Sequence, residues 1–167
     1  MAVLGVKRAN LEDLERLLAI ASACRTDYAE YQPRFWRPAP DAMDRQRAYF
    51  TSILDDDKTL VLTAAEDDAD VRGFAIGRLV PAPPVYDPGG MSCVVDDFAV
   101  AEPDEWLTIG PLLLDALQGW AASRDAAQMI VVTAHLDELK RAALQSYGLT
   151  LASEWWVGSV EQARIQR

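Results

Sequence analysis

The fold of this chain is decided by one stretch, DFAVAEPDEWLTIGPLLLDAL, which runs from Asp97 to Leu117. An apolar run rich in strand-forming residues ends at Val100, and an acidic turn that contains Pro103 follows it. Apolar residues then recur at helical spacing, at Leu113, Ala116, Leu117, Trp120 and Ala121. Because the β-branched run Met129–Thr133 comes next, the sequence predicts a strand, a helix and a second strand, which form a βαβ crossover with parallel strands.

The residues before this stretch predict a strand, two helices and an antiparallel meander. The short apolar segment Val3–Arg8 favours a strand, and Asn10 stands where a helix N-cap is expected, with Asp13 three residues later. Asp41 can cap a second helix that ends near Leu54. β-rich segments separated by acidic and Pro/Gly-rich turns then predict three antiparallel strands, at residues 59–65, 71–80 and 91–100.

The C-terminal part predicts one more helix and one more strand. The helix runs from about Asp137 to Ser146, and Gly148 follows it as a C′ glycine would. Residues 149–160, which are rich in Trp and Val, predict the last strand. We therefore expect residues 1–167 to form a single α/β (α+β) domain. Its mixed central sheet would have about six strands, in the order βααβββαβαβ, with helices on both faces.

The composition excludes several classes of function. The 167 residues carry 16 Lys and Arg against 26 Asp and Glu, for a net charge of −10, and an acidic chain without a basic stripe is a poor ligand for nucleic acid. His135 is the single histidine, and Cys24 and Cys93 stand far apart, so no metal site is expected. No apolar run approaches the roughly 20 residues that cross a bilayer, and the N-terminus lacks a secretory segment. The expected location is therefore cytoplasmic, without a membrane partner.

The element order and two motifs resemble the GNAT superfamily of acyl-CoA-dependent N-acetyltransferases. The Asp97–Leu117 stretch is similar to the family's fourth strand, pyrophosphate loop and following helix, and Leu139–Tyr147 followed by Gly148-Leu149 is similar to its late helix ending in Gly-Phe. The resemblance implies acetyl-CoA or another acyl-CoA as co-substrate, without a metal. It also implies a set of cofactor-binding positions: Phe98, Ala99, Val100, Trp106, Leu107, Thr108, Ile109 and Gly110.

The chemistry of such a site follows from unpaired backbone groups. A strand that diverges from its parallel neighbour leaves N–H and C=O groups in need of partners, and the amides of an acyl-pantetheine arm can supply them. The N–H groups and the positive dipole end of the next helix suit a pyrophosphate. By resemblance, the backbone of Phe98 and Val100 would contact the arm, a strand N–H would polarise the acyl carbonyl, and an acceptor amine would attack the thioester directly.

The loop departs from the family pattern, which is Arg or Gln, two residues, Gly, one residue, and Gly or Ala. The matching positions here are Glu105, Thr108 and Gly110, so only the last small residue is kept. Thr108 lacks the backbone freedom of glycine, and the carboxylates of Glu102, Asp104 and Glu105 stand where an anionic cofactor would pass. We therefore expect weaker cofactor binding or a shifted pyrophosphate.

Three residues are candidates for proton transfer. Asp96 and Asp97 are adjacent on a strand and should point to opposite faces, so that only one of them, here Asp97, serves as general base. His135 follows the second strand of the crossover, and its ordinary pKa suits proton transfer near neutrality. The family's general-acid tyrosine, four residues before the Gly, is Leu144 here, which leaves Tyr147 as the candidate. Each of the three also has a structural alternative: solvation at a strand end, or capping and packing.

The acceptor is expected to be an amine of a small molecule or a peptide. The loop between the first two helices gathers aromatic and basic residues, and the Pro-rich segment 81–90 either covers the same cleft or forms only a long hairpin turn. The candidate acceptor-site residues are Tyr31, Arg34, Trp36 and Tyr86. Arg34 or Arg37 could bind a carboxylate, whereas packing of the loop onto the sheet is the alternative role for Trp36.

Two functions remain open at the level of sequence. The first is an N-acetyltransferase. The alternative, motivated by the altered loop and the missing tyrosine, is a catalytically silent GNAT-fold module that senses a ligand or binds a protein. Independently, the adjacent Trp155 and Trp156 cannot both face the core of a last strand, so a homodimer through that strand is a further hypothesis.

Overall fold

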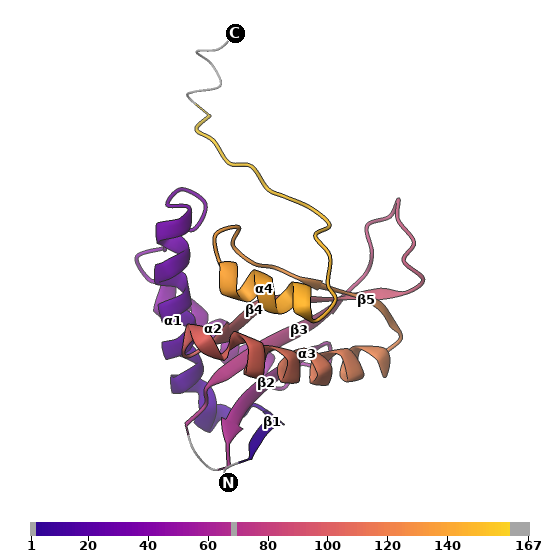
Figure 1. The fold of residues 1–167 in the computed structure, drawn as a ribbon, viewed down its shortest axis with the longest axis horizontal. Coiled ribbons are helices and arrows are strands. Elements are labelled where there is room, and N and C mark those ends of the chain that lie inside the picture. The colour runs from indigo at the N-terminus through magenta and orange to yellow at the C-terminus, as the bar shows by residue number, and fades with distance from the viewer. Residues whose placement is uncertain (1–2, 68–69, 161–167) are drawn as a thin grey trace.

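A five-stranded mixed sheet forms the centre of the computed structural model, which describes residues 3–67 and 70–160. The strands follow one another across the sheet in chain order (Figure 1): β1 (Leu4–Arg8), β2 (Thr59–Glu66), β3 (Gly73–Val80), β4 (Met91–Val100) and β5 (Ala126–Val131). The first four strands pair antiparallel, and β5 pairs parallel with β4. The predicted mixed sheet with its βαβ crossover is confirmed, with strand bounds that differ from the prediction by a few residues.

Helices cover both faces of the sheet, as predicted. They are α1 (Leu14–Tyr31), α2 (Ala42–Ile53), α3 (Trp106–Ala122) and α4 (Glu138–Ser146), with short 3-10 turns at Leu11–Asp13 and Pro103–Glu105. In β2, Leu60 and Leu62 pack in one core with α3 and α4, which lie in front of the strands in Figure 1, whereas Val61 packs in the other core with α1 and α2. Because it is covered on both faces, β2 is an almost continuous apolar run.

The helix ends agree with two predictions and differ from a third. Asn10 forms a capping box, in which its side chain accepts from Glu12 N at 2.8 Å while its own N–H donates to Asp13 Oδ2 at 3.0 Å. Gly148 has φ +99° and closes α4. Asp41 precedes α2, but its carboxylate binds Arg45 at 2.8 Å instead of capping the helix.

The prediction of a last strand at residues 149–160 is wrong. In the structure these residues form no strand and run away from the sheet (Figure 1), and Trp155 and Trp156 are 82% and 90% exposed. Trp and Val favour a strand only when a neighbouring strand and a half-buried face receive them, and β5 stays at the sheet edge without taking up this segment. The described sheet therefore has five strands rather than about six.

Within the described residues, no helix is long and apolar enough to span a bilayer. No cluster of three metal-ligating side chains is found in that part of the chain either.

Candidate active site

The strands β4 and β5 separate halfway along β4. Their pairing runs from Met91 to Val95, and the last contact is the hydrogen bond from Val132 N to Val95 O at 2.9 Å. β4 continues from Asp96 to Val100 beside β3 alone. The edge of β4 that faces away from β3 is therefore open to side chains or a ligand over these residues.

A β-bulge lies at the point of separation. Ala75 pairs with Phe98 and Gly77 pairs with Val95, so that two residues of β4, Asp96 and Asp97, oppose the single residue Ile76 of β3. A bulge changes the alternation of side chains along a strand. The expectation that Asp96 and Asp97 point to opposite faces is accordingly wrong, because both line the same cavity.

This cavity has a volume of about 220 Å³ and lies beside α2. Its lining combines two carboxylates, a guanidinium, a phenol and two aliphatic side chains, contributed by Tyr49, Ile76, Arg78, Val94, Asp96 and Asp97. Tyr49 comes from α2, and the other five come from the adjacent strands β3 and β4. Neither Tyr49 nor Arg78 was predicted from the sequence.

Among the described carboxyl groups, Asp97 is one whose surroundings raise its pKa. Burial raises its pKa to about 6, and the neighbouring charge of Asp96 acts in the same direction. Lys140, Arg25 and Arg78 act in the opposite direction. A carboxylate with this pKa is ionised at neutral pH and can still accept a proton readily, as a general base must.

A lysine that was not predicted from the sequence fills the open edge of β4. Lys140 of α4 is 1% exposed, and its Nζ donates to Phe98 O at 2.9 Å and to Tyr28 Oη at 3.4 Å. Tyr28 in turn donates to Asp137 Oδ2 at 3.2 Å. The Phe98 carbonyl, which would accept from β5 if the two strands stayed paired, thus accepts a hydrogen bond from Lys140 instead.

The surroundings of Lys140 are aromatic. Its Nζ lies 5.3, 5.4 and 5.9 Å from the ring centres of Phe98, Trp106 and Tyr28. Full burial lowers the pKa of Lys140, while Cys24, Asp137, Asp96 and Asp97 act in the opposite direction. A sequence signal existed: position 140 shares its helix face with the buried residues Ala143 and Leu144.

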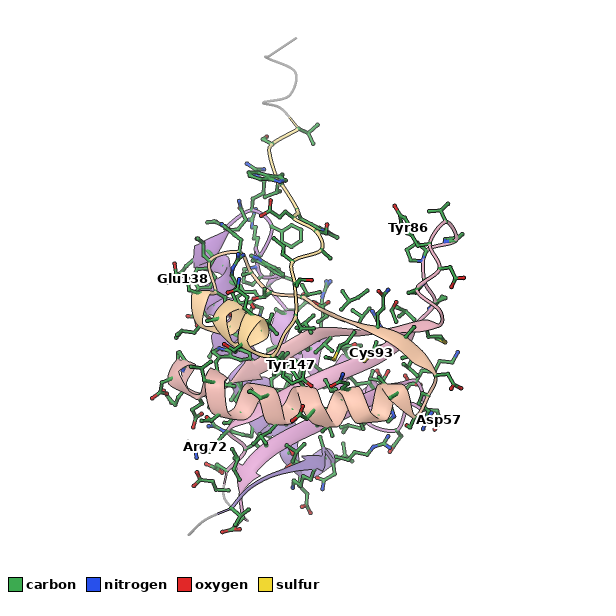
Figure 2. All side chains as sticks on the ribbon, turned by 45° about the vertical axis from the view of Figure 1, so that its right-hand side comes forward. Asp57, Arg72, Tyr86, Cys93, Glu138 and Tyr147 are labelled. Atoms are coloured by element: carbon green, nitrogen blue, oxygen red, sulfur yellow. The ribbon has the colours of Figure 1, made fainter. Side chains whose placement is uncertain are left out.

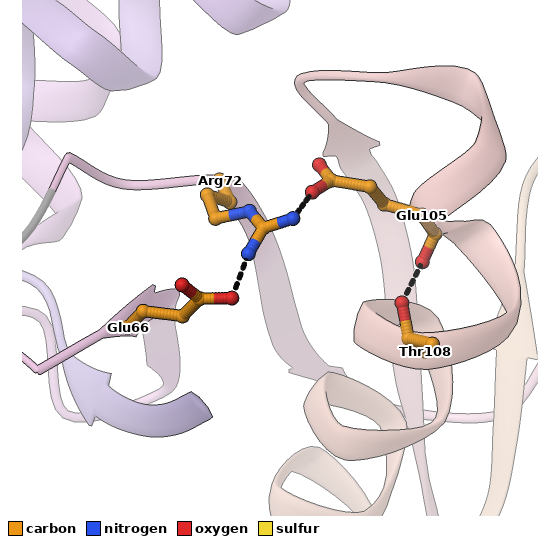
Figure 3. A network of polar contacts seen from close by, with 4 residues as sticks. All are labelled: Glu66, Arg72, Glu105 and Thr108. Atoms are coloured by element: carbon orange, nitrogen blue, oxygen red, sulfur yellow. Dashed lines mark hydrogen bonds and ion pairs between the residues drawn. The ribbon is translucent and has the colours of Figure 1, made fainter. Parts of the chain in front are cut away.

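At the N-terminus of α3, the acidic residue of the altered loop has a cationic partner. Arg72 lies between Glu66 and Glu105 and forms an ion pair with each (Figure 3). The other oxygen of Glu105, Oε2, is buried and meets no partner in the described part of the chain. The Thr108 hydroxyl donates a hydrogen bond to the main-chain oxygen of Glu105 at 3.1 Å. The guanidinium of Arg72 at this end of α3 is therefore already neutralised by the two carboxylates.

The remaining predicted cofactor positions divide between core and surface. The core takes Phe98, Ala99, Trp106, Ile109 and Gly110, whereas Leu107 and Thr108 are exposed and Val100 is half-buried. The Phe98 and Trp106 rings pack edge to face at 4.8 Å. A Cβ on Gly110 would meet Trp106, Phe98 and Ala143 at 3.4–3.9 Å, which is ordinary van der Waals contact.

Two predicted proton-transfer residues lie outside the cavity lining. Tyr147 ends α4 and faces α3 (Figure 2), with its hydroxyl 2.8 Å from Asp115 Oδ1 and 2.7 Å from Gln118 Oε1. Burial and the hydrogen bond to Asp115 raise its pKa to about 12. His135 is exposed in the turn between β5 and α4. Of the three candidates, the structure brings only Asp97 to the cavity.

The predicted acceptor residues lie on two loops and the end of α1. The Trp36 ring packs against Tyr28 at 5.0 Å, Tyr31 packs against Tyr28 at 5.9 Å, and Arg34 is exposed. Tyr86 is 72% exposed on the segment between β3 and β4, which projects from the sheet (Figure 2). None of the four lines the cavity at the bulge.

Solved structures of other proteins share this architecture. A predicted acetyltransferase from Clostridium acetobutylicum, solved with acetyl-CoA, matches with a TM-score of 0.73 and 19% identity over 96% of this chain and 98% of its own. An aminoglycoside 6'-N-acetyltransferase from Acinetobacter baumannii matches with a TM-score of 0.72 and 12% identity over 94% and 97%. A protein from Bacillus halodurans matches with a TM-score of 0.80 and 13% identity over 93% and 99%. The chain has the fold of the GNAT acetyltransferases.

No model of a protein family matches the chain, and no curated protein does. At these identities the likeness to GNAT structures concerns the fold. Beside the separated strands, this chain places the carboxylate of Asp97 and the amine of Lys140.

Proposed function

We propose that this GNAT-fold protein is an acyl-CoA-dependent N-acyltransferase, which transfers an acetyl group to an amine of a small molecule or a peptide. One observation carries the proposal: the separation of β4 from β5 lies directly beside a cavity that contains two carboxylates. The opening offers backbone groups of β4 to an extended ligand, and the cavity offers a proton acceptor.

In this proposal each residue at the bulge has a defined task. Acyl-CoA supplies an activated thioester when it is bound. The backbone of Phe98 and Val100 holds its pantetheine arm along the open edge of β4. Asp97 accepts the proton that the acceptor ammonium loses before or during attack, and its raised pKa suits this exchange. Asp96 adds a second negative charge that attracts a cationic acceptor.

The size and charge of the cavity favour a small cationic acceptor. Its volume of about 220 Å³ lies below the roughly 300–1,000 Å³ typical of pockets for drug-sized ligands. It therefore suits a small amine, or the amine end of a longer chain whose remainder lies outside. Arg78 in the same lining can bind an acidic group of the acceptor.

Replacing Glu105 by Gln is expected to strengthen acetyl-CoA binding about fivefold. The change removes a negative charge from the N-terminus of α3 and breaks one of the two ion pairs of Arg72, and a charge contact in water is worth about 1 kcal/mol. Calorimetric titration at fixed salt measures the effect. Glu15→Gln, which removes a carboxylate paired with Arg47 at the surface, is the control and should change nothing. Unchanged or weaker binding by Glu105→Gln would show that the pyrophosphate does not approach this end.

A second candidate function is a catalytically silent module that binds a ligand or a protein. The specific observation that favours it is the occupied edge of β4, where Lys140 already bonds to the Phe98 carbonyl. The unpaired Glu105 Oε2 adds an acceptor where a pyrophosphate would need donors.

An assay of thiol release separates the two functions. The protein is incubated with acetyl-CoA and a panel of small amines and peptides, and free CoA and acylated amine are measured together. Amine-dependent release of CoA, with an equal amount of acylated product, supports the transferase. Bound acetyl-CoA without any amine-dependent release supports the silent module.

We also propose that the protein forms a homodimer through residues 149–160. Support comes from the edge position of β5 and from the exposed rings of Trp155 and Trp156 on a segment that leaves the body of the protein. Light scattering is expected to give twice the chain mass at micromolar concentration, and Trp155→Ala with Trp156→Ala is expected to restore the monomer. A monomeric mass for the unmodified protein would refute the dimer.

A further inference from the structure

Lys140 is a buried amine whose location the reaction outlined above leaves unexplained. It projects from α4 into the gap between β4 and β5, and its Nζ bonds to the main-chain carbonyl of Phe98. In the described part of the chain, no carboxylate lies within ion-pair distance of this nitrogen. A cation buried in this way is costly, because the desolvation of the ammonium is only partly offset by one carbonyl and by three aromatic side chains, one of which, Tyr28, also accepts through its hydroxyl.

The surroundings of Lys140 favour its neutral form more than those of an exposed lysine do. Burial lowers its pKa, against the opposing influence of Cys24, Asp137, Asp96 and Asp97. Tyr28 connects it to Asp137, since the ammonium donates to the phenol oxygen and the phenol donates to the carboxylate. A neutral lysine amine is a nucleophile, whereas an exposed lysine is almost entirely protonated at neutral pH and therefore reacts much more slowly.

We infer that Lys140 Nζ is itself an acyl acceptor, so that the protein acylates its own α4 from acyl-CoA. The inference rests on the proposed function, in which the pantetheine arm runs along the open edge of β4. The arm and Lys140 then compete for the Phe98 carbonyl. Because Lys140 Nζ lies 2.9 Å from this oxygen, an arm that binds along the edge at Phe98 would lie against the amine, and an amine held next to a thioester reacts at a high effective concentration.

The step is an ordinary aminolysis. The neutral Nζ attacks the acyl carbon, a C–N bond forms, and the C–S bond breaks as the tetrahedral centre collapses. The CoA thiolate leaves and takes up the proton that the nitrogen loses, so the products are an N-acyl lysine and free CoA thiol. The new amide retains one N–H, which can donate to Phe98 O, and its nitrogen can no longer be protonated to a buried cation.

The chain makes this inference easy to test, because it contains only three lysines, Lys7, Lys58 and Lys140. Lys7 and Lys58 are exposed, and Lys7 pairs with Asp13. The folded protein is incubated with acetyl-CoA without any added amine, and peptide mass spectrometry follows each lysine over time. Lys140 should be acetylated at least about tenfold faster than Lys7 or Lys58, because only Lys140 reacts with a bound donor.

Three comparisons make the result decisive. The Lys140→Arg variant, which keeps a cation and a donor for Phe98 O, should lose the fast acetylation. The double variant Lys7→Arg with Lys58→Arg should keep it, and protein unfolded in urea should show no preference for Lys140. Acetyl-CoA binding is measured in parallel by calorimetry. Binding without acetylation of Lys140 overturns this inference alone, whereas absence of binding overturns the proposed function together with it.

Discussion

Replacing Asp97 by Asn is expected to lower kcat/KM for acyl transfer about hundredfold, which is at the lower end of what a general base contributes. The amide keeps the size of the side chain but cannot take up the proton of the acceptor ammonium. Asp97 lies at the bulge, lines the cavity, and has a pKa raised to about 6 by burial and by Asp96. Steady-state kinetics with the best amine from the thiol-release assay measures the loss.

The pH profile provides a stricter check of the same residue. A base must be ionised to act, so wild-type activity should rise with pH through about 6 and then level off. Asp97→Asn should lack this rise. Asp96→Asn is the matched control: it keeps the base, removes the neighbouring charge, and should move the rise to lower pH. A wild-type rise that persists in Asp97→Asn would assign the base to another group.

Asp97→Asn, which is expected to lower activity, is expected to increase stability. The pKa of Asp97 is raised on folding, from an ordinary 3.8 to about 6, so the unfolded chain ionises at lower pH than the folded one. The ionisation of Asp97 therefore lowers the free energy of unfolding. The loss is complete above about pH 6 and disappears below about pH 4. Asp97→Asn should raise the melting temperature at pH 7.5 and leave it unchanged near pH 3.5. Equal melting temperatures at pH 7.5 would show that burial does not penalise this carboxylate.

Replacing Phe74 by Ala is expected to reduce the free energy of unfolding by about 3–5 kcal/mol. Phe74 of β3 is 1% exposed, and its ring packs edge to face on Phe50 of α2, with 5.8 Å between ring centres. It belongs to the core between the sheet and the α1/α2 layer, beside the cavity residue Ile76. Urea denaturation followed by circular dichroism measures the change.

Phe35→Ala is the matched control for this prediction. The Phe35 ring is 44% exposed on the loop between α1 and α2, where it packs on Trp36 and Trp155. Its loss should cost less than about 1 kcal/mol, as for most surface positions. A comparable cost for both substitutions would mean that the core does not lie between the sheet and α2 as described.

Local features of the sequence were enough to predict most of the fold. The capping box at Asn10 and the C′ glycine at Gly148 depend only on neighbouring residues, and both are found in the structure. The last strand depended on a partner that its own residues cannot supply. Leu149 leaves α4, and the following residues extend past β5 without joining the sheet, although Trp155 and Val157 favour strands.

The site was less predictable for the same reason. The bulge that brings Asp96 and Asp97 into one cavity arises from the register between β3 and β4, which neither strand contains by itself. Lys140 stood on the apolar face of its helix, but its residue type suggested a surface position. Arg72 neutralises Glu105 from a segment 33 residues away in the chain. Each of these features is a contact between distant segments.

The most direct test of the proposed acyltransferase function is a calorimetric titration of the wild-type protein with acetyl-CoA at physiological salt. We expect one site per chain with a dissociation constant in the micromolar range, because the open edge of β4 would offer its backbone to the pantetheine arm while the acidic start of α3 would weaken the binding of the pyrophosphate. No detectable binding by protein shown to be folded would contradict that function.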